Sequence, residues 1–354
     1  MKNILKFLAL SLLCFSHQIN ALVILQYHHI SNSTPASTSL SPELFQKHLS
    51  YLKENDFNVI KLESAINLLK SGQFIEDKSV VITFDDGYRS IYTTAFPLLK
   101  KYEFPFTVFI NTAPIEQKLP QFMNWKELQD LIDHKGSVAN HSVNHLHLIR
   151  QSQADKSSNL ESLIRNEIMN AQSVLERNLS HVLKAFAYPY GEYSLKTKSI
   201  VKSLGFVAFG QHSGAASNKT DLQAIPRFPF GGNYGDLDDF ILKVNSLSMP
   251  VEQIFLLDED NNEIKEYLLE HNINKPKLKI ILSVEQNELQ VVCFASGGQQ
   301  LSSITVLKGY IFSPSLSLPV GRSRFNCTAP SGQEGRFYWF SQPWIKPNDK
   351  GYYF

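Results

Sequence analysis

Between residues 22 and 247, short apolar runs rich in Val, Ile and Phe alternate with amphipathic stretches. The runs LVILQYHH, SVVITFDD, FTVFI and GSVAN have the length and composition of buried strands. The stretch SPELFQKHLSYLKEN has helical spacing, with Ser41 as its N-cap and Pro42 at its first helical position. Strands that alternate with helices favour βα units around a parallel sheet. About seven such strands predict an α/β fold, a closed or nearly closed (β/α) barrel.

After Pro250 the pattern changes to short β-rich runs separated by Asn, Gly, Ser and Pro, such as KLKIILSV, ELQVVCFA and GRFYWFSQ. We therefore expect an α/β domain over residues 22–248 and a small all-β sandwich over residues 249–354. Its expected layout is loosely immunoglobulin-like, with Cys293 and Cys327 on facing strands and Trp339 near them.

The first 21 residues have the pattern of an export signal: two lysines, the apolar stretch FLALSLLCFS, and Ala21 before the expected cleavage point. The stretch is short for a membrane span, which needs ~20 apolar residues. We expect cleavage, no integral span in the mature chain and a periplasmic or extracellular protein, with an uncleaved anchor as the alternative. In an oxidising compartment Cys293 and Cys327 are expected to form a disulfide, the alternative being two unrelated buried thiols.

The composition of the 354 residues, 43% hydrophobic and 19% charged, is that of a globular protein. The formal net charge is +1 and no long run of like charge occurs, so composition favours neither a nucleic-acid nor an anionic-membrane partner. It also gives no indication of a particular oligomeric state.

Two adjacent aspartates, Asp85 and Asp86, end the apolar run SVVITF. In a parallel α/β barrel the carboxyl ends of the strands carry the chemistry, so both side chains are expected at the site. A solvated Asp-Asp-Gly turn is the structural alternative.

Two histidines, His141 and His145, follow the predicted strand GSVAN. At this spacing they can face one ion, and a carboxylate from another strand end completes a set of two histidines and one carboxylate. Ser142 stands where a zinc-protease helix would have glutamate, which argues against that class.

A third segment, FAYPYG, ends another predicted strand, and its Pro189 and Gly191 favour a tight turn that can aim a backbone N–H into the site. Taken in order, TFDDG, HSVNH and PYG resemble the motifs of NodB-like polysaccharide deacetylases, carbohydrate esterase family four. The resemblance covers roughly residues 22 to 230 and is greatest to the periplasmic or extracellular branch that acts on poly-N-acetylglucosamine. It implies a distorted (β/α) barrel.

The resemblance implies that Asp86, His141 and His145 bind a divalent metal, Zn²⁺ before Co²⁺, Ni²⁺ or Fe²⁺. It implies that Asp85 is the general base and that the backbone N–H of Tyr190 donates a hydrogen bond to the oxyanion. The implied reaction is removal of N-acetyl groups from N-acetylglucosamine residues of a surface or cell-wall polysaccharide. Poly-N-acetylglucosamine, chitin-like chains and peptidoglycan glycan all carry this group.

The sequence departs from the family pattern at two places. Ala187 replaces the arginine that commonly orients the base, and we expect Arg227 to take this role, with surface pairing as the alternative. Arg227→Ala is expected to lower turnover while metal content and folding stay intact. The Leu-x-His motif that ends the family's set and supplies the general acid is not evident, and His28 or His29 is expected in that role before His212.

Two other classes remain open at this stage. A non-haem iron oxygenase also uses two histidines and a carboxylate, although it needs no second carboxylate beside the ligand. A catalytically weak or inactive carbohydrate-binding or adhesion protein on the same fold would explain the added β domain and the missing arginine.

Overall fold

The computed structural model describes residues 21–149, 159–232, 234–283, 289–350 and 353. The predicted export signal lies outside the described residues, except for Ala21. Among the helices that are described, none has both the length and the apolar character needed to cross a bilayer.

Eight strands form a parallel sheet in the order β10-β1-β5-β6-β7-β8-β9, with β4 paired to β5. Ile225, which precedes β10, forms a parallel bridge with Phe209 of β9, so the two edges of the sheet approach each other in an incomplete barrel. This arrangement agrees with the predicted α/β class. The strands are β1 Leu22–Tyr27, β4 Asn58–Val59, β5 Ser79–Phe84, β6 Phe106–Ile110, β7 Gly136–Asn140, β8 Ala185–Ala187, β9 Val207–Phe209 and β10 Phe228–Pro229.

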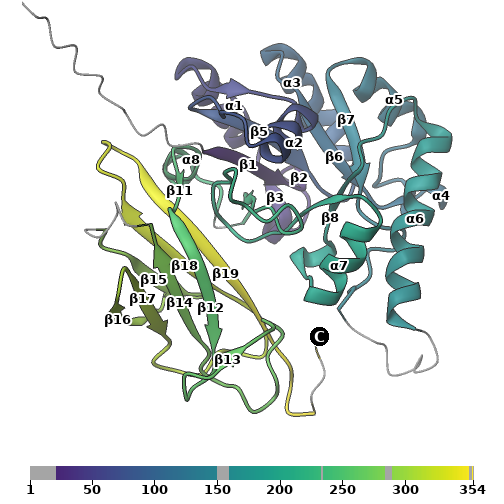
Figure 1. The fold of residues 1–354 in the computed structure, drawn as a ribbon. Helices are drawn as coiled ribbons and strands as arrows, with labels where there is room; N and C mark the ends of the chain where they lie inside the picture. Colours follow the sequence, from purple (N-terminus) through teal and green to yellow (C-terminus); the bar gives the residue numbers. More distant parts are fainter. Residues whose placement is uncertain (1–20, 150–158, 233, 284–288, 351–352, 354) are drawn as a thin grey trace, which may run out of the picture.

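Helices surround this sheet in the upper right of Figure 1. The predicted start of the first helix is confirmed, since the Ser41 hydroxyl accepts a hydrogen bond from the Leu44 backbone N–H at 3.1 Å. The α-helices are α1 Pro42–Glu54, α2 Leu62–Ser71, α3 Phe96–Tyr102, α4 Thr112–Glu116, α5 Trp125–Asp133, α6 Leu160–Asn178, α7 Leu195–Ser203 and α8 Leu237–Val244. The short elements are β2 His29–Ile30, β3 Ser39–Leu40, a π-helical turn Ile91–Ala95 before α3, and 3₁₀ turns Ala36–Thr38 and Pro189–Gly191.

The central strands β1 and β5 are buried at every position. Burial on both faces explains why their sequences are nearly continuous apolar runs rather than alternating ones. The backbone N–H of Asp85 still donates to Tyr27 O at 2.9 Å, so the residue after β5 remains anchored to the end of β1. The hydrogen-bonded end of β5 thus fixes the backbone position from which the two aspartates follow.

From Leu247 onward the regular elements that the structure describes are all strands, in two further sheets at the lower left of Figure 1. One has the order β11-β19-β18-β15 and the other β13-β12-β14-β17-β16. The separate sheets agree with the predicted β-rich second part, and the division at residue 248 stays a prediction. The strands are β11 Leu247–Ser248, β12 Val251–Leu257, β13 Glu263–Ile264, β14 Lys277–Leu282, β15 Val292–Ala295, β16 Ser302–Val306, β17 Gly309–Ser313, β18 Gly321–Pro330 and β19 Phe337–Lys346.

A disulfide joins Cys293 of β15 to Cys327 of β18, as predicted. The expected immunoglobulin-like placement is wrong in one respect, because the two cysteines are direct partners on neighbouring strands of one sheet. In the immunoglobulin layout the bridge connects two facing sheets. Trp339, paired with Thr328 beside Cys327, packs instead against Phe228 of β10 with ring centroids 5.2 Å apart.

Loss of the disulfide is expected to destabilise the β part. The bridge joins cysteines 34 residues apart, and in the chain-entropy model closing such a loop contributes about 3–4 kcal/mol. The Cys293→Ser/Cys327→Ser double variant should therefore unfold at lower denaturant concentration than the parent. Thiol titration of the unfolded, non-reduced chain from Leu22 onward should find no free thiol. Two free thiols would contradict the bridge.

Candidate active site

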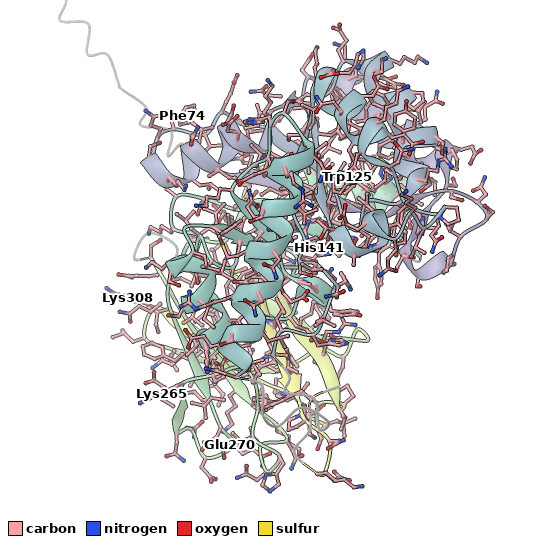
Figure 2. All side chains as sticks on the ribbon, turned by 90° about the vertical axis from the view of Figure 1, so that its right-hand side faces the viewer. Phe74, Trp125, His141, Lys265, Glu270 and Lys308 are labelled. Atoms are coloured by element: carbon pink, nitrogen blue, oxygen red, sulfur yellow. A yellow bond between two sulfur atoms is a disulfide. The ribbon has the colours of Figure 1, made fainter. Side chains whose placement is uncertain are left out.

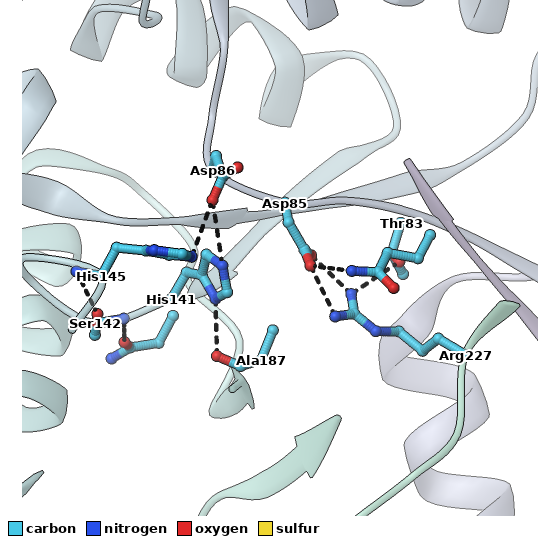
Figure 3. Close-up of polar contacts among 10 residues, drawn as sticks. Thr83, Asp85, Asp86, His141, Ser142, His145, Ala187 and Arg227 are labelled. Carbon is cyan, nitrogen blue, oxygen red and sulfur yellow. Dashed lines mark hydrogen bonds and ion pairs between the residues drawn. The ribbon is translucent and has the colours of Figure 1, made fainter. Parts of the chain in front are cut away.

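The two aspartates after β5 point toward different partners (Figure 3). Asp86 faces His141 and His145, whereas Asp85 faces the guanidinium of Arg227. Asp86 adopts a left-handed backbone conformation with φ 70°, which non-glycine residues rarely take. This turn of the chain separates the two carboxylates although they are adjacent in sequence.

Asp86, His141 and His145 form one cluster whose candidate ligand atoms all lie within 4.8 Å of one another. Asp86 Oδ1 is 3.3 Å from His141 Nε2 and 3.4 Å from His145 Nε2. His141 comes from the end of β7 and is fully buried, among the side chains of the α/β part in Figure 2. The predicted residues are thus together in space, and their role as ligands remains a prediction.

The hydrogen bonds of His141 fit a cation in this cluster. Its Nδ1 lies 2.8 Å from Ala187 O, and because a carbonyl can only accept, Nδ1 carries a proton. In the neutral ring Nε2 then presents a lone pair, and this buried atom has no hydrogen-bond partner among the described residues. A lone pair that faces the Asp86 carboxylate at 3.3 Å is repelled unless a proton or a metal ion lies between the two atoms. The residues present therefore fit a divalent metal.

The electrostatics of the cluster also favour a bound cation. Burial would raise the pKa of Asp86, but the neighbouring His141 lowers it well below its usual range. Burial and repulsion by His141 lower the pKa of His145 to about 4, so its ring is neutral and can act as a ligand near pH 7. Burial would likewise lower the pKa of His141, but Asp86 and Asp85 raise it above the ordinary value.

Protons are expected to compete with the metal at His141. The pKa of His141 is raised above 6.5, and at pH values below that pKa the ring is protonated and charged. The charged ring has no lone pair for a metal. Metal affinity should therefore fall about tenfold per pH unit as pH drops through that pKa. Competition with a chelating indicator at several pH values, corrected for the indicator's own protonation, measures it. An affinity that is constant from pH 8 down to about pH 5.5 would refute the proton linkage.

The loop that carries both histidines is held in an unusual conformation, with Ser142 at φ 73° and His145 at φ 55°. Such conformations cost of order 1–3 kcal/mol each and persist only where surrounding contacts enforce them. Here the Ser142 hydroxyl accepts from the His145 N–H at 3.0 Å, and the Glu167 carboxylate accepts from Val143 N, Asn144 N and Asn144 Nδ2 at 2.7–3.2 Å. A buried glutamate on α6 thus positions the loop.

Asp85 forms a fully buried ion pair with Arg227. The guanidinium binds both carboxylate oxygens, at 2.7 Å and 2.8 Å, and Gln26 Nε2 donates to Oδ2 at 2.7 Å. Burial would raise the pKa of Asp85, but Arg227 and then His141 lower it, so the carboxylate is ionised near neutral pH. Of the hydrogen bonds described, Oδ1 accepts only that from Arg227, which leaves it a lone pair for a proton.

The predicted contact between Arg227 and Asp85 is therefore present, whereas the surface position is wrong. The expectation that its removal would spare folding also needs revision, since both side chains are 0% exposed. Removing one partner of a buried pair typically costs about 3–5 kcal/mol.

Substitution of Arg227 is expected to affect both stability and turnover. Arg227→Ala should lower the unfolding free energy by about 3–5 kcal/mol and turnover about tenfold or more, because Asp85 loses its orientation. Arg227→Lys keeps a charge without the bidentate geometry and should lose less stability while turnover still falls. Thermal melts and acetate release measure the two effects. Wild-type turnover in the lysine variant would show that bidentate binding is not needed.

The Tyr190 turn follows β8. Tyr190 has φ 59° and ψ 5°, and Gly191 follows at φ 68°, so two successive residues are left-handed. A side chain at 191 would place its Cβ 2.6 Å from the Gln211 Cβ, so glycine is required there. The His145 ring lies against the Tyr190 ring with centroids 4.4 Å apart, which places this turn beside the cluster of Asp86, His141 and His145, the candidate metal cluster.

The three histidines considered as general acid occupy different surroundings. His28 is half-buried and close enough for its charge to lower the pKa values of Asp85 and Asp86. His29 instead stacks on Tyr88, with ring centroids 3.6 Å apart. Burial lowers the pKa of His212 to about 3, so its ring is neutral near pH 7 and lacks the imidazolium proton of a general acid. These surroundings argue against His212, and the role of His28 remains a prediction.

A cavity of about 1470 Å³ lies beside this region, between the α/β part and the strands after Ser248. Tyr193, His212, Tyr267 and Trp339 are among its lining residues, and Asp85, Asp86, His141 and His145 are not. We assign no chemistry to this cavity, because Asp85, Asp86, His141 and His145 lie at the strand ends instead.

Comparison with known proteins agrees with this geometry. Residues 75–209 match the family model described as polysaccharide deacetylase. The chain therefore contains a polysaccharide deacetylase domain of the NodB-like class, carbohydrate esterase family four, and the resemblance identified from its motifs is confirmed.

Individual relatives extend the match. The chain is 28% identical over 210 residues to a poly-beta-1,6-N-acetyl-D-glucosamine N-deacetylase of Staphylococcus aureus, covering 57% of this chain and 71% of that protein. Among solved structures it is similar to IcaB from Ammonifex degensii, with 26% identity and a TM-score of 0.53 over 60% of this chain and 93% of that one. It is also similar to the Streptococcus pyogenes deacetylase PplD in complex with acetate, with 25% identity and a TM-score of 0.55 over 61% and 95%.

Proposed function

We propose that this protein is a metal-dependent hydrolase that removes N-acetyl groups from N-acetylglucosamine residues of a surface or cell-wall polysaccharide. The observation that carries the proposal is the pair of adjacent carboxylates with separate partners, Asp86 in the histidine cluster and Asp85 on Arg227. One carboxylate can bind a cation while its neighbour stays free to accept a proton.

In this proposal Asp86, His141 and His145 hold the divalent metal. These residues would hold a cation that supplies Lewis acidity to the acetamido carbonyl and that would lower the pKa of water. Asp85 accepts the proton of the attacking water, and the bidentate contact with Arg227 at 2.7 Å and 2.8 Å keeps its carboxylate oriented.

Two further groups complete the reaction. The backbone N–H of Tyr190 donates to the oxyanion that develops on the acetyl carbonyl, a contribution of ~3 kcal/mol for one donor of this kind. His28 donates the proton with which the sugar amine leaves, because an unprotonated amine is a poor leaving group. The products are acetate and a free amino sugar.

The choice of substrate is supported by the Staphylococcus aureus relative, whose name gives poly-β-1,6-N-acetylglucosamine as its substrate. Acetate release should be measured with that polymer, a chitin oligomer and peptidoglycan glycan. Release from the first polymer supports the proposal, and preference for another one changes the substrate but not the reaction. Binding of these polymers without any acetate release would favour the carbohydrate-binding or adhesion alternative.

We also propose export to the periplasm or the extracellular space, where such polysaccharides are modified. The N-terminal pattern of lysines, apolar stretch and Ala21 supports it, as does the Cys293–Cys327 disulfide, since disulfides persist in oxidising compartments. N-terminal sequencing of the exported protein tests the expected start near Leu22.

A further inference from the structure

Strand β18 directs two arginines toward the α/β part. Along this strand Ser323 and Phe325 are buried, while Arg322 and Arg324 alternate with them on the other face. Arg322 Nη1 donates to Tyr190 O at 2.7 Å, and Arg324 Nη1 donates to Gln211 O at 3.0 Å. The C-terminal sheet thus contacts the turn beside the metal cluster.

The Tyr190 turn needs support from outside. A left-handed tyrosine costs roughly 1–2 kcal/mol, and the hydrogen bond inside the turn, from Gly191 N to Tyr188 O at 2.8 Å, is local. Gly191 lies directly against Gln211, as the absence of room for a Cβ shows. Arg322 and Arg324 therefore hold the two backbone segments that pack against each other at this turn.

Arg322 contacts the turn at more than one point. Its guanidinium lies over the Tyr190 ring, 5.6 Å from the centroid, and its Nε is 3.6 Å from Glu192 Oε1. The other carboxylate oxygen of Glu192 is 2.8 Å from His147 Nδ1, and the His147 ring stacks on Tyr190 at 3.8 Å. The cluster of Arg322, Glu192 and His147 therefore fixes both the carbonyl and the ring of Tyr190.

We propose that Arg322 is a positioning residue, contributed by the C-terminal sheet, that keeps the Tyr190 turn in its left-handed conformation. This inference rests on the proposed function, in which the Tyr190 N–H binds the developing oxyanion. Arg322 is in contact with neither Asp85 nor the metal cluster in the described contacts, so it acts through the turn. The C-terminal sheet then assists the reaction of the deacetylase domain.

Arg336 provides a matched control, because it connects the same two parts elsewhere. It binds both oxygens of Asp77, at 2.9 Å and 3.0 Å, and donates to Asn245 O at 3.0 Å. Asp77 precedes β5 and Asp85 follows it, so the length of that strand, roughly 20 Å, separates this contact from the site.

The test compares Arg322→Ala, Arg322→Lys and Arg336→Ala by steady-state kinetics of acetate release. Arg322→Ala should lower kcat about tenfold with KM changed less than about twofold, since the oxyanion contact strengthens only in the transition state. Arg322→Lys should recover part of the loss, because its ammonium can still donate to Tyr190 O. Arg336→Ala should keep the parental kcat. An equal loss of kcat in Arg336→Ala would show that the effect comes from general contact between the α/β part and the C-terminal sheet, and would overturn the inference.

Hydrogen exchange of the peptide 188–193 gives a readout that does not need activity. Its amides should exchange faster in Arg322→Ala than in the parent and in Arg336→Ala, because the turn opens more often. If the parent protein releases no acetate, the proposed function is refuted. The hydrogen-exchange rates of the peptide 188–193 then test the positioning role of Arg322 by themselves. Unchanged exchange in Arg322→Ala would overturn its positioning role.

Discussion

Replacing Asp85 by asparagine is expected to leave the metal bound while turnover falls by ~10²–10⁴, because the amide cannot accept the proton from water. The metal should stay because the three candidate ligands are Asp86, His141 and His145. Metal analysis and acetate release on the same sample measure the two quantities. Near-normal release would show that Asp85 is structural.

Asp77→Asn is the matched control for this variant. Asp77 also binds an arginine bidentately, Arg336, but its side chain is exposed and lies at the far end of β5. Turnover of this control should stay within about twofold of the parent. Because Asp85→Asn removes the counterion of the buried Arg227, its melting temperature must be measured too, and the assay run well below it.

Replacing His141 by alanine is expected to empty the metal site and abolish acetate release. The parent should hold about one divalent ion per chain, and the two ligands that remain in the variant hold zinc poorly. His145→Ala should have the same effect at lower cost to folding, since the His145 side chain is 22% exposed and His141 is fully buried.

His134→Ala serves as the control for both histidine variants. His134 is exposed and pairs with Asp130 at 3.1 Å on the surface, so its loss should change neither metal content nor turnover. Undiminished metal content in the folded His141→Ala and His145→Ala variants would refute the ligand assignment.

The sequence predicted which side chains of the candidate site lie close together because its motifs are local. Asp85, Asp86 and His141 each follow a run of buried strand residues directly, and strand ends of a parallel sheet meet at one edge. Arg227 was predicted because IPRFPF reads as a later strand that reaches the same edge of the sheet, and β10, which directly follows Arg227, pairs with β1. Its full burial was not predicted, because a strand-end arginine can equally face solvent.

Other parts of the site have no local signature. Gln26 is one polar residue within an otherwise apolar strand, and only the pairing of β1 with β5 brings it to Asp85. Glu167 lies on α6, where charged residues are common, and its contact with the histidine loop depends on how that helix packs. Arg322 reaches Tyr190 from a different sheet, a tertiary contact that no motif spacing encodes.

In the β-rich part, too, local features could be predicted from the sequence and tertiary contacts could not. The short alternating runs after Pro250 predicted strands correctly, since a period of two residues is a local property. Which strands become neighbours is not local. Cys293 and Cys327 were expected on facing strands of an immunoglobulin-like sandwich and are direct partners within one sheet. A cysteine pair restricts distance but does not specify whether a bridge lies within a sheet or between sheets.

The most direct test of the account is acetate release from poly-β-1,6-N-acetylglucosamine by the protein as purified, after chelation and dialysis, and after Zn²⁺ is restored. The account predicts release by the purified protein, a loss of about tenfold or more in the metal-free protein, and recovery with the added ion. Release that continues undiminished in protein shown by metal analysis to be metal-free would contradict a metal-dependent deacetylase site at Asp86, His141 and His145.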